Sequence, residues 1–129
     1  MVTLFSWNKG NSTFGNKRDD ILVTIERYKP DIFAIHEANF DFQRDRGFDN
    51  YNIEYNTICK GYSMSRTILL IKKGIAYKRR NDLENDYISS VWVQIILSKR
   101  VSTFICSYYR QWSLPQELNI NGSNLITLK

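Results

Sequence analysis

The stretch from Pro30 to Phe40 constrains the fold of this chain more than any other. Pro30 cannot continue a helix, so the helical pattern that precedes it has to end there. The four residues from Ile32 to Ile35 are all apolar, which is typical of a short strand buried on both faces. Polarity then rises abruptly at His36 and Glu37. An acidic side chain therefore follows a core strand, at the kind of position where α/β proteins hold ligands.

The segments around this strand predict a strand, a helix and a second strand in one crossover unit. Val2 to Trp7 is rich in strand formers, and Asn8 follows it in a loop of turn-forming residues. Lys17 to Lys29 has helical periodicity, with Asn16 as the predicted cap. A right-handed crossover sets the two strands parallel, so we expect Asn8 and Glu37 at the same edge of the sheet.

The remainder of the chain predicts more strands and no further helix. A buried strand is expected over residues 65–74, and shorter ones over residues 51–55 and 75–78. Residues 91–97 and 101–109 form the strongest hairpin signal, and both strands are apolar on both faces, so we expect a sheet that is covered on both faces. No strong element is expected after Tyr109. The pattern predicts an α/β fold with one mixed sheet and one helix.

Length and charge limit the class of protein. The 129 residues, 43% of them hydrophobic, are enough for one domain with a core, and two cysteines show no zinc-site spacing. No signal peptide or membrane-spanning run is recognisable, so an intracellular protein, nuclear or cytoplasmic, without a membrane partner is expected. The net charge is +5, and residues 44–80 hold nine Lys or Arg against three acids. A polyanion such as nucleic acid is a plausible partner.

Three polar groups follow predicted buried strands: Asn8, Glu37, and the pair Tyr109 and Arg110. A carboxylate from Glu37 with an amide oxygen from Asn8 suits Mg²⁺, which usually takes only one or two carboxylates from a protein. Tyr109 and Arg110 are donors that could bind a phosphate oxygen. The alternative is that Asn8 only forms a turn and that Glu37 is exposed or ion-paired.

Four motifs together resemble a known family: Phe5-Ser6-Trp7-Asn8, Tyr28-Lys29-Pro30-Asp31-Ile32-Phe33-Ala34-Ile35-His36-Glu37-Ala38-Asn39, Ser65-Arg66-Thr67-Ile68-Leu69-Leu70 and Tyr108-Tyr109-Arg110-Gln111-Trp112. In this order they resemble the endonuclease/exonuclease/phosphatase superfamily, and more closely the endonuclease region at the front of non-LTR retrotransposon polyproteins. The resemblance covers residues 2 to about 115.

The resemblance implies a role for individual residues. Glu37 matches the metal-binding glutamate, Asn8 the asparagine that organises metal and phosphate, and Tyr109 the active-site tyrosine at the scissile phosphate. Members of the family cut phosphodiesters with Mg²⁺. His36 stands where many relatives carry glutamine, and it is expected to be a structural neighbour of Glu37.

The resemblance also implies a DNA-binding surface, in which Arg66 and Arg110 face backbone phosphates. Lys72 and Lys73, with the basic cluster Lys78 to Arg80, are the alternative location of the DNA-binding face.

The sequence departs from the family after the last strand. Relatives continue with a Gly-Asp-x-Asn segment and a Ser-Asp-His segment, and neither occurs in these 129 residues. Residues 1–129 are therefore expected to be a single incomplete domain, the N-terminal half of a DNA endonuclease that is inactive alone. The alternatives are a non-catalytic nucleic-acid-binding module that uses residues 44–80, or a degenerate element copy without function.

The resemblance implies that the chain forms half of a two-sheet α/β sandwich, with one mixed sheet and one helix. Such a half-domain would leave apolar faces of its sheet uncovered. This predicts partial exposure of the side chains on the inward face, and with it self-association through an exposed sheet face. The side chains concerned are Leu4, Ile68, Leu70, Val93, Ile95 and Ile105.

Overall fold

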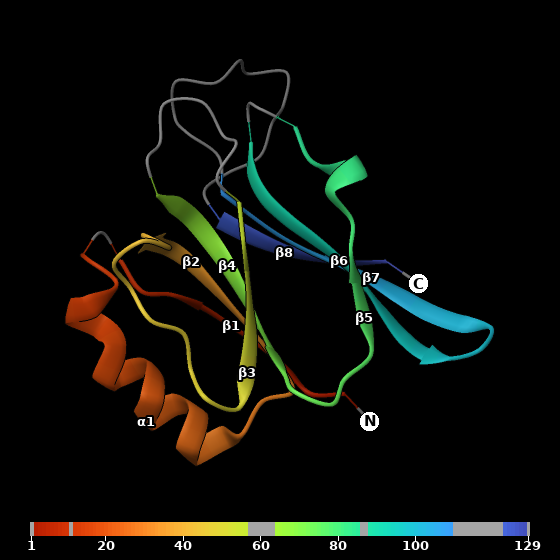
Figure 1. Cartoon of the computed structure of the whole chain (residues 1–129), viewed down its shortest axis with the longest axis horizontal. Coiled ribbons are helices and arrows are strands. Elements are labelled where there is room, and N and C mark those ends of the chain that lie inside the picture. The colour runs from red at the N-terminus through yellow and green to blue at the C-terminus, as the bar shows by residue number, and fades with distance from the viewer. Residues whose placement is uncertain (1, 11, 57–63, 86–87, 110–122, 129) are drawn as a thin grey trace.

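The computed structural model describes residues 2–10, 12–56, 64–85, 88–109 and 123–128. Two four-stranded sheets face each other, and one helix covers the outer side of the first sheet (Figure 1). The first sheet has the strand order β1-β2-β4-β3 and the second the order β5-β6-β7-β8. The elements are β1 (Leu4–Asn8), α1 (Arg18–Tyr28), β2 (Ile32–Phe40), β3 (Tyr51–Tyr55), β4 (Ser65–Lys72), β5 (Tyr77–Arg79), β6 (Ser89–Ser98), β7 (Val101–Tyr109) and β8 (Ser123–Leu128), with short 3₁₀ turns at Gly15–Lys17 and Asn81–Leu83.

The predicted α/β class and mixed sheet are confirmed, and α1 is the one α-helix within the described residues. β1 and β2 are parallel neighbours, while β4 runs antiparallel to both β2 and β3. The second sheet is antiparallel throughout, and β8 is a strand that the sequence did not predict. Among the described residues, no helix is both long enough and apolar enough to cross a membrane.

Helix α1 ends where the sequence predicted, and begins differently. Lys29 takes a left-handed conformation with φ of 45° after the last turn, and Pro30 prevents continuation. The predicted cap Asn16 lies inside the 3₁₀ turn that precedes the helix, and no side chain caps the helix start. The prediction of Asn16 as cap is therefore wrong, because the 3₁₀ turn supplies the entry to the helix instead.

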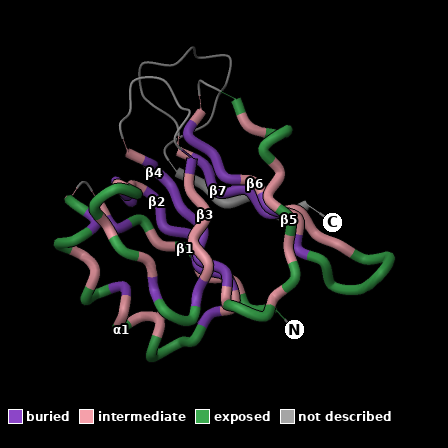
Figure 2. The backbone as a smooth tube through the Cα atoms, viewed as in Figure 1, coloured by how far each residue is buried: buried purple, intermediate pink, exposed green. Residues whose placement is uncertain are grey.

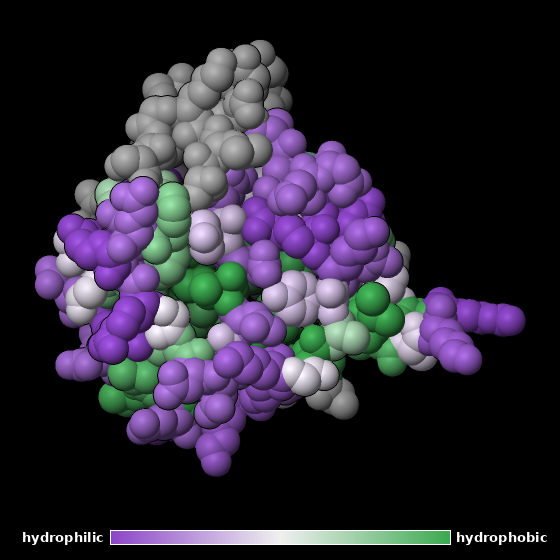
Figure 3. Space-filling model, in the orientation of Figure 1, coloured by the Kyte–Doolittle hydropathy of each residue, from purple (hydrophilic) through white to green (hydrophobic). Residues whose placement is uncertain are grey.

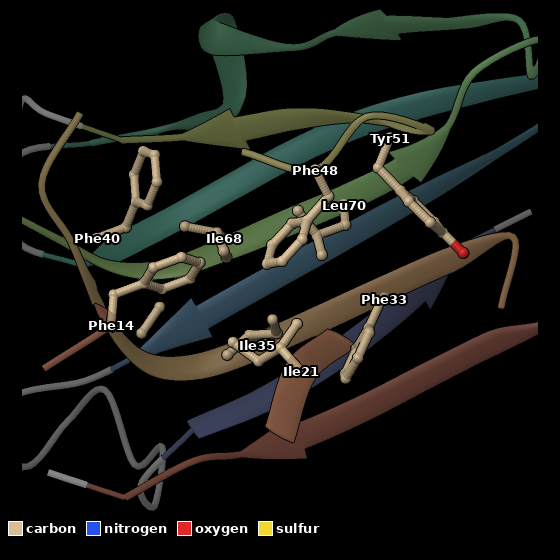
Figure 4. Close-up of a cluster of buried hydrophobic side chains, with 10 residues drawn as sticks. Phe14, Ile21, Phe33, Ile35, Phe40, Phe48, Tyr51, Ile68 and Leu70 are labelled. Carbon is tan, nitrogen blue, oxygen red and sulfur yellow. The ribbon is translucent and has the colours of Figure 1, made fainter. Parts of the chain in front are cut away.

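The first hydrophobic core lies between α1 and the first sheet (Figure 4). Ile21 of the helix is fully buried against side chains from β2 and β4. Aromatic rings from the connecting segments close the sides of this core. Its buried members are Phe14, Ile21, Phe33, Ile35, Ala38, Phe40, Phe48, Tyr51, Ile68 and Leu70.

The second hydrophobic core lies between the two sheets, where Figure 2 shows the strands in the colour of buried residues. Alternate residues from the first half of β2 and the second half of β4 pack into it, against residues of β6 and β7. Its buried members are Ile32, Ala34, Leu69, Ile71, Val91, Val93, Ile95 and Ile105. The second sheet thus covers the first within this chain.

The expected exposure of the inward faces is wrong. Val93, Ile95 and Ile105 are at most 3% exposed, because they pack against the first sheet. Ile68 and Leu70 are fully buried, but on the helix side of their strand. Leu4, at the edge of the first sheet, is half-buried. Self-association stays a prediction that this burial does not test.

The outer face of the second sheet is only partly covered. The turn of the β6–β7 hairpin projects from the body, and hydrophobic surface is visible there in Figure 3. Ile96, Leu97 and Val101 are 44%, 52% and 53% exposed. The prediction that this hairpin is covered on both faces holds for its inward side and is wrong near the turn.

Candidate active site

The carboxyl ends of β1 and β2 lie side by side at one end of the first sheet (Figure 1). Asn8 is paired with His36 across these strands, and Thr67 near the start of β4 lies opposite His36 on its other side. Three strands therefore reach the same end of the sheet. Asn8 and Glu37 are both located there, as the crossover topology predicted.

β2 runs through Glu37 and ends only at Phe40, with a bulge in its second half. From 36 to 40 the strand advances four residues while β4 advances two, from 67 to 65. Glu37 and Asn39 have φ of 54° and 50°, in the left-handed region. The prediction of a strand that stops at Ile35 is wrong. The strand continues past Ile35, and the bulge changes the direction in which its side chains point. Bulges of this kind are common next to active sites.

The left-handed backbone at Glu37 is unfavourable for its residue type. Asn tolerates this conformation, so Asn39 fits its position. For Glu the cost is about 1 to 2 kcal/mol relative to ordinary φ values. Strain of this kind persists where the surrounding structure enforces it, and it concentrates at functional sites. Glu37 is half-buried, so its carboxylate keeps access to solvent.

The loop after β1 places a lysine in the interior of the site. The side-chain oxygen of Asn8 accepts a hydrogen bond from the Gly10 amide at 3.0 Å, which fixes the turn. Lys9 is only 5% exposed, and its ammonium donates to the carbonyls of Gly10, at 3.2 Å, and Ser12. Burial lowers the pKa of Lys9, and the negative charge of Glu37 opposes that shift. A buried cation therefore acts on the candidate metal ligand.

Asn39, Arg66 and Tyr109 connect the two sheets at this end. The Asn39 amide donates to the Ser12 carbonyl at 3.1 Å, and its oxygen accepts from Arg66 at 2.6 Å. The guanidinium carbon of Arg66 lies 4.6 Å from the centroid of the Tyr109 ring, a cation–π contact. Arg66 belongs to the first sheet and Tyr109 to the second. The contact holds the last residue of β7 beside the end of β2.

His36 lies behind the site and is held between the sheets. Its Nε2 is 2.9 Å from the Ser6 hydroxyl and its Nδ1 is 3.4 Å from the Ser107 hydroxyl. The Ser107 hydroxyl also bonds to that of Thr67. Burial lowers the pKa of His36 to about 4, so the ring is neutral at physiological pH. This agrees with the expected role of His36 as a structural neighbour of Glu37.

The structure does not bring every predicted DNA-binding residue to this end. Lys72 lies six residues beyond Arg66 on the same strand, which places it roughly 20 Å away. Lys72 lies 3.4 Å from the Asp31 carboxylate, and with Lys73 it lines a cavity of about 500 Å³ beside the end of α1. Both lysines stay candidates for a contact elsewhere on the surface. Arg110 lies outside the described residues.

The donor set at the site fits a hard cation. The Glu37 carboxylate and the Asn8 amide oxygen are ligand types that Mg²⁺ prefers. The described part of the chain holds no group of three His, Cys, Asp or Glu side chains that could enclose a metal. Water and substrate oxygens would therefore complete the coordination of Mg²⁺ here.

Sequence reasoning missed Lys9 and Asn39. Lys9 stands in a loop of small polar residues, where a lysine normally points into solvent, so nothing in the sequence indicated its burial. Asn39 did carry a signal. A polar residue between Ala38 and Phe40, in a segment that is otherwise apolar, has to find a hydrogen-bond partner when it is buried.

The fold is similar to that of a solved endonuclease domain. The endonuclease domain of TRAS1, a telomere-specific non-LTR retrotransposon, matches with a TM-score of 0.68 and 15% sequence identity. The match covers 92% of this chain and 49% of that chain. The chain thus spans about half the length of the solved domain. No protein-family model matches the chain, and no curated protein matches it significantly.

At this level of identity the likeness establishes the fold. The chain has a nuclease-like fold of two facing sheets, and the resemblance recognised in the sequence motifs is confirmed in that respect. The activity and substrate of the TRAS1 domain do not follow for this chain from the likeness alone.

Proposed function

We propose that this chain carries the metal- and phosphate-binding part of a Mg²⁺-dependent DNA endonuclease site. The observation that carries the proposal is the meeting of Asn8, Glu37, Arg66 and Tyr109 at one end of a nuclease-like fold. We further propose that residues 1–129 correspond to the N-terminal half of such a domain. The match to about half of a solved endonuclease domain supports this assignment.

Each of the four side chains has a distinct role in this proposal. Glu37 and Asn8 supply oxygen ligands to Mg²⁺, which when bound polarises a phosphate oxygen and stabilises the developing negative charge. Arg66, whose guanidinium is held by the Asn39 side chain, neutralises a non-bridging phosphate oxygen with its positive charge. Tyr109 donates its hydroxyl to the same phosphate group while Arg66 fixes its ring. Because these groups contact only the backbone, binding is independent of base sequence.

Hydrolysis by these 129 residues alone is expected to be negligible. An attacking water needs a group that accepts its proton, and the described residues hold no cluster of acids with Glu37. His36 is a weak base because its pKa is about 4, and it is occupied by two serine hydroxyls. Loss of essential members of a catalytic unit lowers rates by many orders of magnitude.

The lack, among the described residues, of a group of three acidic, His or Cys side chains that could enclose a metal also favours a second function. Binding of a phosphate group needs no proton acceptor, so the chain could act as a non-catalytic nucleic-acid-binding module. The two functions differ in their use of Mg²⁺. An endonuclease half-site binds DNA more tightly with Mg²⁺ through Glu37, whereas a plain binding module does not depend on that carboxylate.

The test measures DNA affinity by fluorescence anisotropy, with and without Mg²⁺ at constant ionic strength. For the half-site we expect affinity that falls steeply with salt and rises with Mg²⁺. Glu37→Gln should abolish the gain from Mg²⁺. Glu26→Gln, at an exposed acid on α1, is the matched control and should leave it unchanged.

A plasmid-nicking assay under the same conditions tests the expected inactivity. Nicking that requires Mg²⁺ and disappears in Glu37→Gln would show that the site is complete without further segments. Binding that ignores both Mg²⁺ and Glu37→Gln would favour the non-catalytic module. Absence of salt-dependent binding would contradict both functions.

A further inference from the structure

A half-exposed aromatic ring lies at the tip of the loop that follows β2. Phe42 is 44% exposed, although it belongs to a residue type that is usually buried. Its ring is stacked on that of Tyr55, with centroids 5.5 Å apart and planes inclined by 11°. A nearly parallel pair of this kind presents a flat apolar surface with defined orientation.

The pair is fixed to the hydrophobic core by further rings. Tyr55 contacts Phe40 at 5.4 Å between centroids, and Phe40 packs edge-on against Phe14 at 5.1 Å. Phe40 and Phe14 are 3% and 1% exposed and lie next to each other in Figure 4. The exposed ring is therefore connected to the core by a continuous series of ring contacts.

The loop that presents Phe42 is also held in place. The Asp41 amide donates to the Asp45 carboxylate at 2.9 Å, and the Asp41 carboxylate accepts from the Gln43 amide at 3.0 Å. The Asp45 amide donates to the Asp41 carbonyl at 2.7 Å. These bonds define a tight turn, so little ordering is required when a ligand binds the ring.

The turn carries two acids and two arginines, and the arginines are the more exposed of these charged groups. Both acids are occupied by backbone amides, and Asp45 also has a 3.8 Å contact with Arg44. The side chain of Arg44 is 63% exposed, and Arg46 is also exposed. Basic groups therefore point outward while the acids point into the turn.

We propose that Phe42 is a stacking platform for an unpaired nucleobase of the bound nucleic acid. Phe42 lies three residues after Asn39, which holds Arg66 at the phosphate-binding end. A strand whose phosphate is at Arg66 can therefore lay a neighbouring base on Phe42, with Arg44 and Arg46 beside its backbone. Aromatic platforms next to basic grooves are the general means of binding single strands without sequence preference.

This inference rests on the proposed nucleic-acid binding and adds the form of the substrate. A base in a duplex is already stacked on both sides, so the platform requires a strand that is single or locally opened. The alternative role of Phe42 is to shield Tyr55 at the edge strand β3, a role that any large apolar side chain can fill. The two roles differ in their need for a flat ring.

The test compares two single-stranded DNAs of about 12 nucleotides, one with all bases and one with abasic residues in its centre. We expect the protein to bind the complete strand about 5- to 100-fold more tightly than the abasic strand, as one stacked base contributes. Phe42→Leu keeps apolar volume without a ring plane and should reduce this ratio to about one. Tyr28→Leu, at an exposed aromatic residue on α1, is the matched control and should leave the ratio unchanged.

A second measurement reports stacking directly. A strand with 2-aminopurine at its centre loses fluorescence when that base stacks on a ring, so the unmodified protein and Tyr28→Leu should quench it and Phe42→Leu should not. Thermal unfolding of each variant checks that the fold persists.

The outcomes separate this inference from the proposed function. Salt-dependent binding without a difference between the two strands overturns the platform and leaves the phosphate site intact. An undiminished ratio in Phe42→Leu also overturns the platform. Absence of binding to either strand overturns the proposed function and the platform together.

Discussion

Arg79 donates two hydrogen bonds to Glu84, at 2.9 and 2.8 Å, in a bidentate pair at the junction of the two sheets. The same guanidinium donates to Glu54 of the first sheet at 2.9 Å. Glu54 also accepts a hydrogen bond from Tyr77 of the second sheet at 2.7 Å. The Glu84 side chain is only 1% exposed, so its charge depends on this partner. These polar contacts join the two sheets at the side of the apolar core between them.

Arg79→Met should lower the free energy of unfolding by about 3 to 5 kcal/mol, because it leaves a buried carboxylate without its cation. Urea denaturation followed by tryptophan fluorescence measures the change. Lys78→Met removes an exposed cation from the same strand and is the control, with an expected effect within about 0.5 kcal/mol. A loss below about 1 kcal/mol in Arg79→Met would show that Glu84 finds compensation elsewhere.

Stability should depend on pH through His36. The pKa of His36 falls from 6.5 to about 4 on folding, because the ring is buried between the sheets. The unfolded chain therefore binds more protons than the folded chain between these two pH values. The stability that the folded protein gains from a neutral His36 is complete above pH 6.5 and is lost as the pH falls toward 4. The shift corresponds to about 3 kcal/mol.

His36→Gln is the matched variant, since glutamine can bond to both serines and does not titrate. Urea denaturation at pH 7 and pH 4 should show a fall in stability about 3 kcal/mol larger for the original protein than for this variant. Taking the difference removes the contribution of carboxylates that titrate in both proteins. Equal pH dependence of the two proteins would mean that His36 is solvated in the folded state.

Mg²⁺ should bind weakly, with millimolar affinity in isothermal titration. One carboxylate and one amide provide little negative charge to offset the dehydration of this ion, and the buried ammonium of Lys9 opposes it. Lys9→Met should tighten Mg²⁺ binding roughly fivefold, about 1 kcal/mol, by removing that charge. Glu37→Gln should abolish binding. Sub-micromolar affinity in the original protein would mean that more ligands take part than Glu37 and Asn8.

Arg66 should dominate the salt dependence of DNA binding at the candidate site. Arg66→Ala should weaken binding uniformly across sequences and reduce the slope of log affinity against log salt by about one. Arg66→Lys should keep most of the slope, because it retains the charge and loses only the planar contact with Tyr109. The paired change of Lys72 and Lys73 to Ala tests the other end of the sheet. A larger effect there would move the DNA-binding face away from Glu37.

The sequence predicted the crossover unit well because its signals are local. Helical periodicity, Pro30 and the apolar run from Ile32 are read within a few residues, and the parallel pairing follows from chirality rules. The bulge at Glu37 was not predictable in this way. A rise in polarity normally marks the end of a strand, but here Ser6, Arg66 and Ser107 satisfy the polar residues of β2.

The prediction of which β4 side chains face the second sheet was wrong for a different reason. A run of apolar residues from Ile68 to Ile71 has no alternation, so the sequence does not indicate which side faces the helix. Leu69 and Ile71 face the second sheet, and a one-residue error exchanges the two sets. The burial of Lys9 was equally inaccessible, since it depends on carbonyl groups that only the folded loop presents.

The left-handed backbone at Glu37 implies that the stability of the fold and the chemical role of the carboxylate favour different residues at this position. Glycine would adopt φ of 54° without the side-chain penalty, so Glu37→Gly should relieve a cost of about 1 to 2 kcal/mol while removing the carboxylate. A chain selected only for persistence would drift toward glycine here, and one selected for its chemistry would keep the acid despite the cost. The stability gained in Glu37→Gly, measured by urea denaturation, would therefore give the cost of keeping a carboxylate at this backbone position.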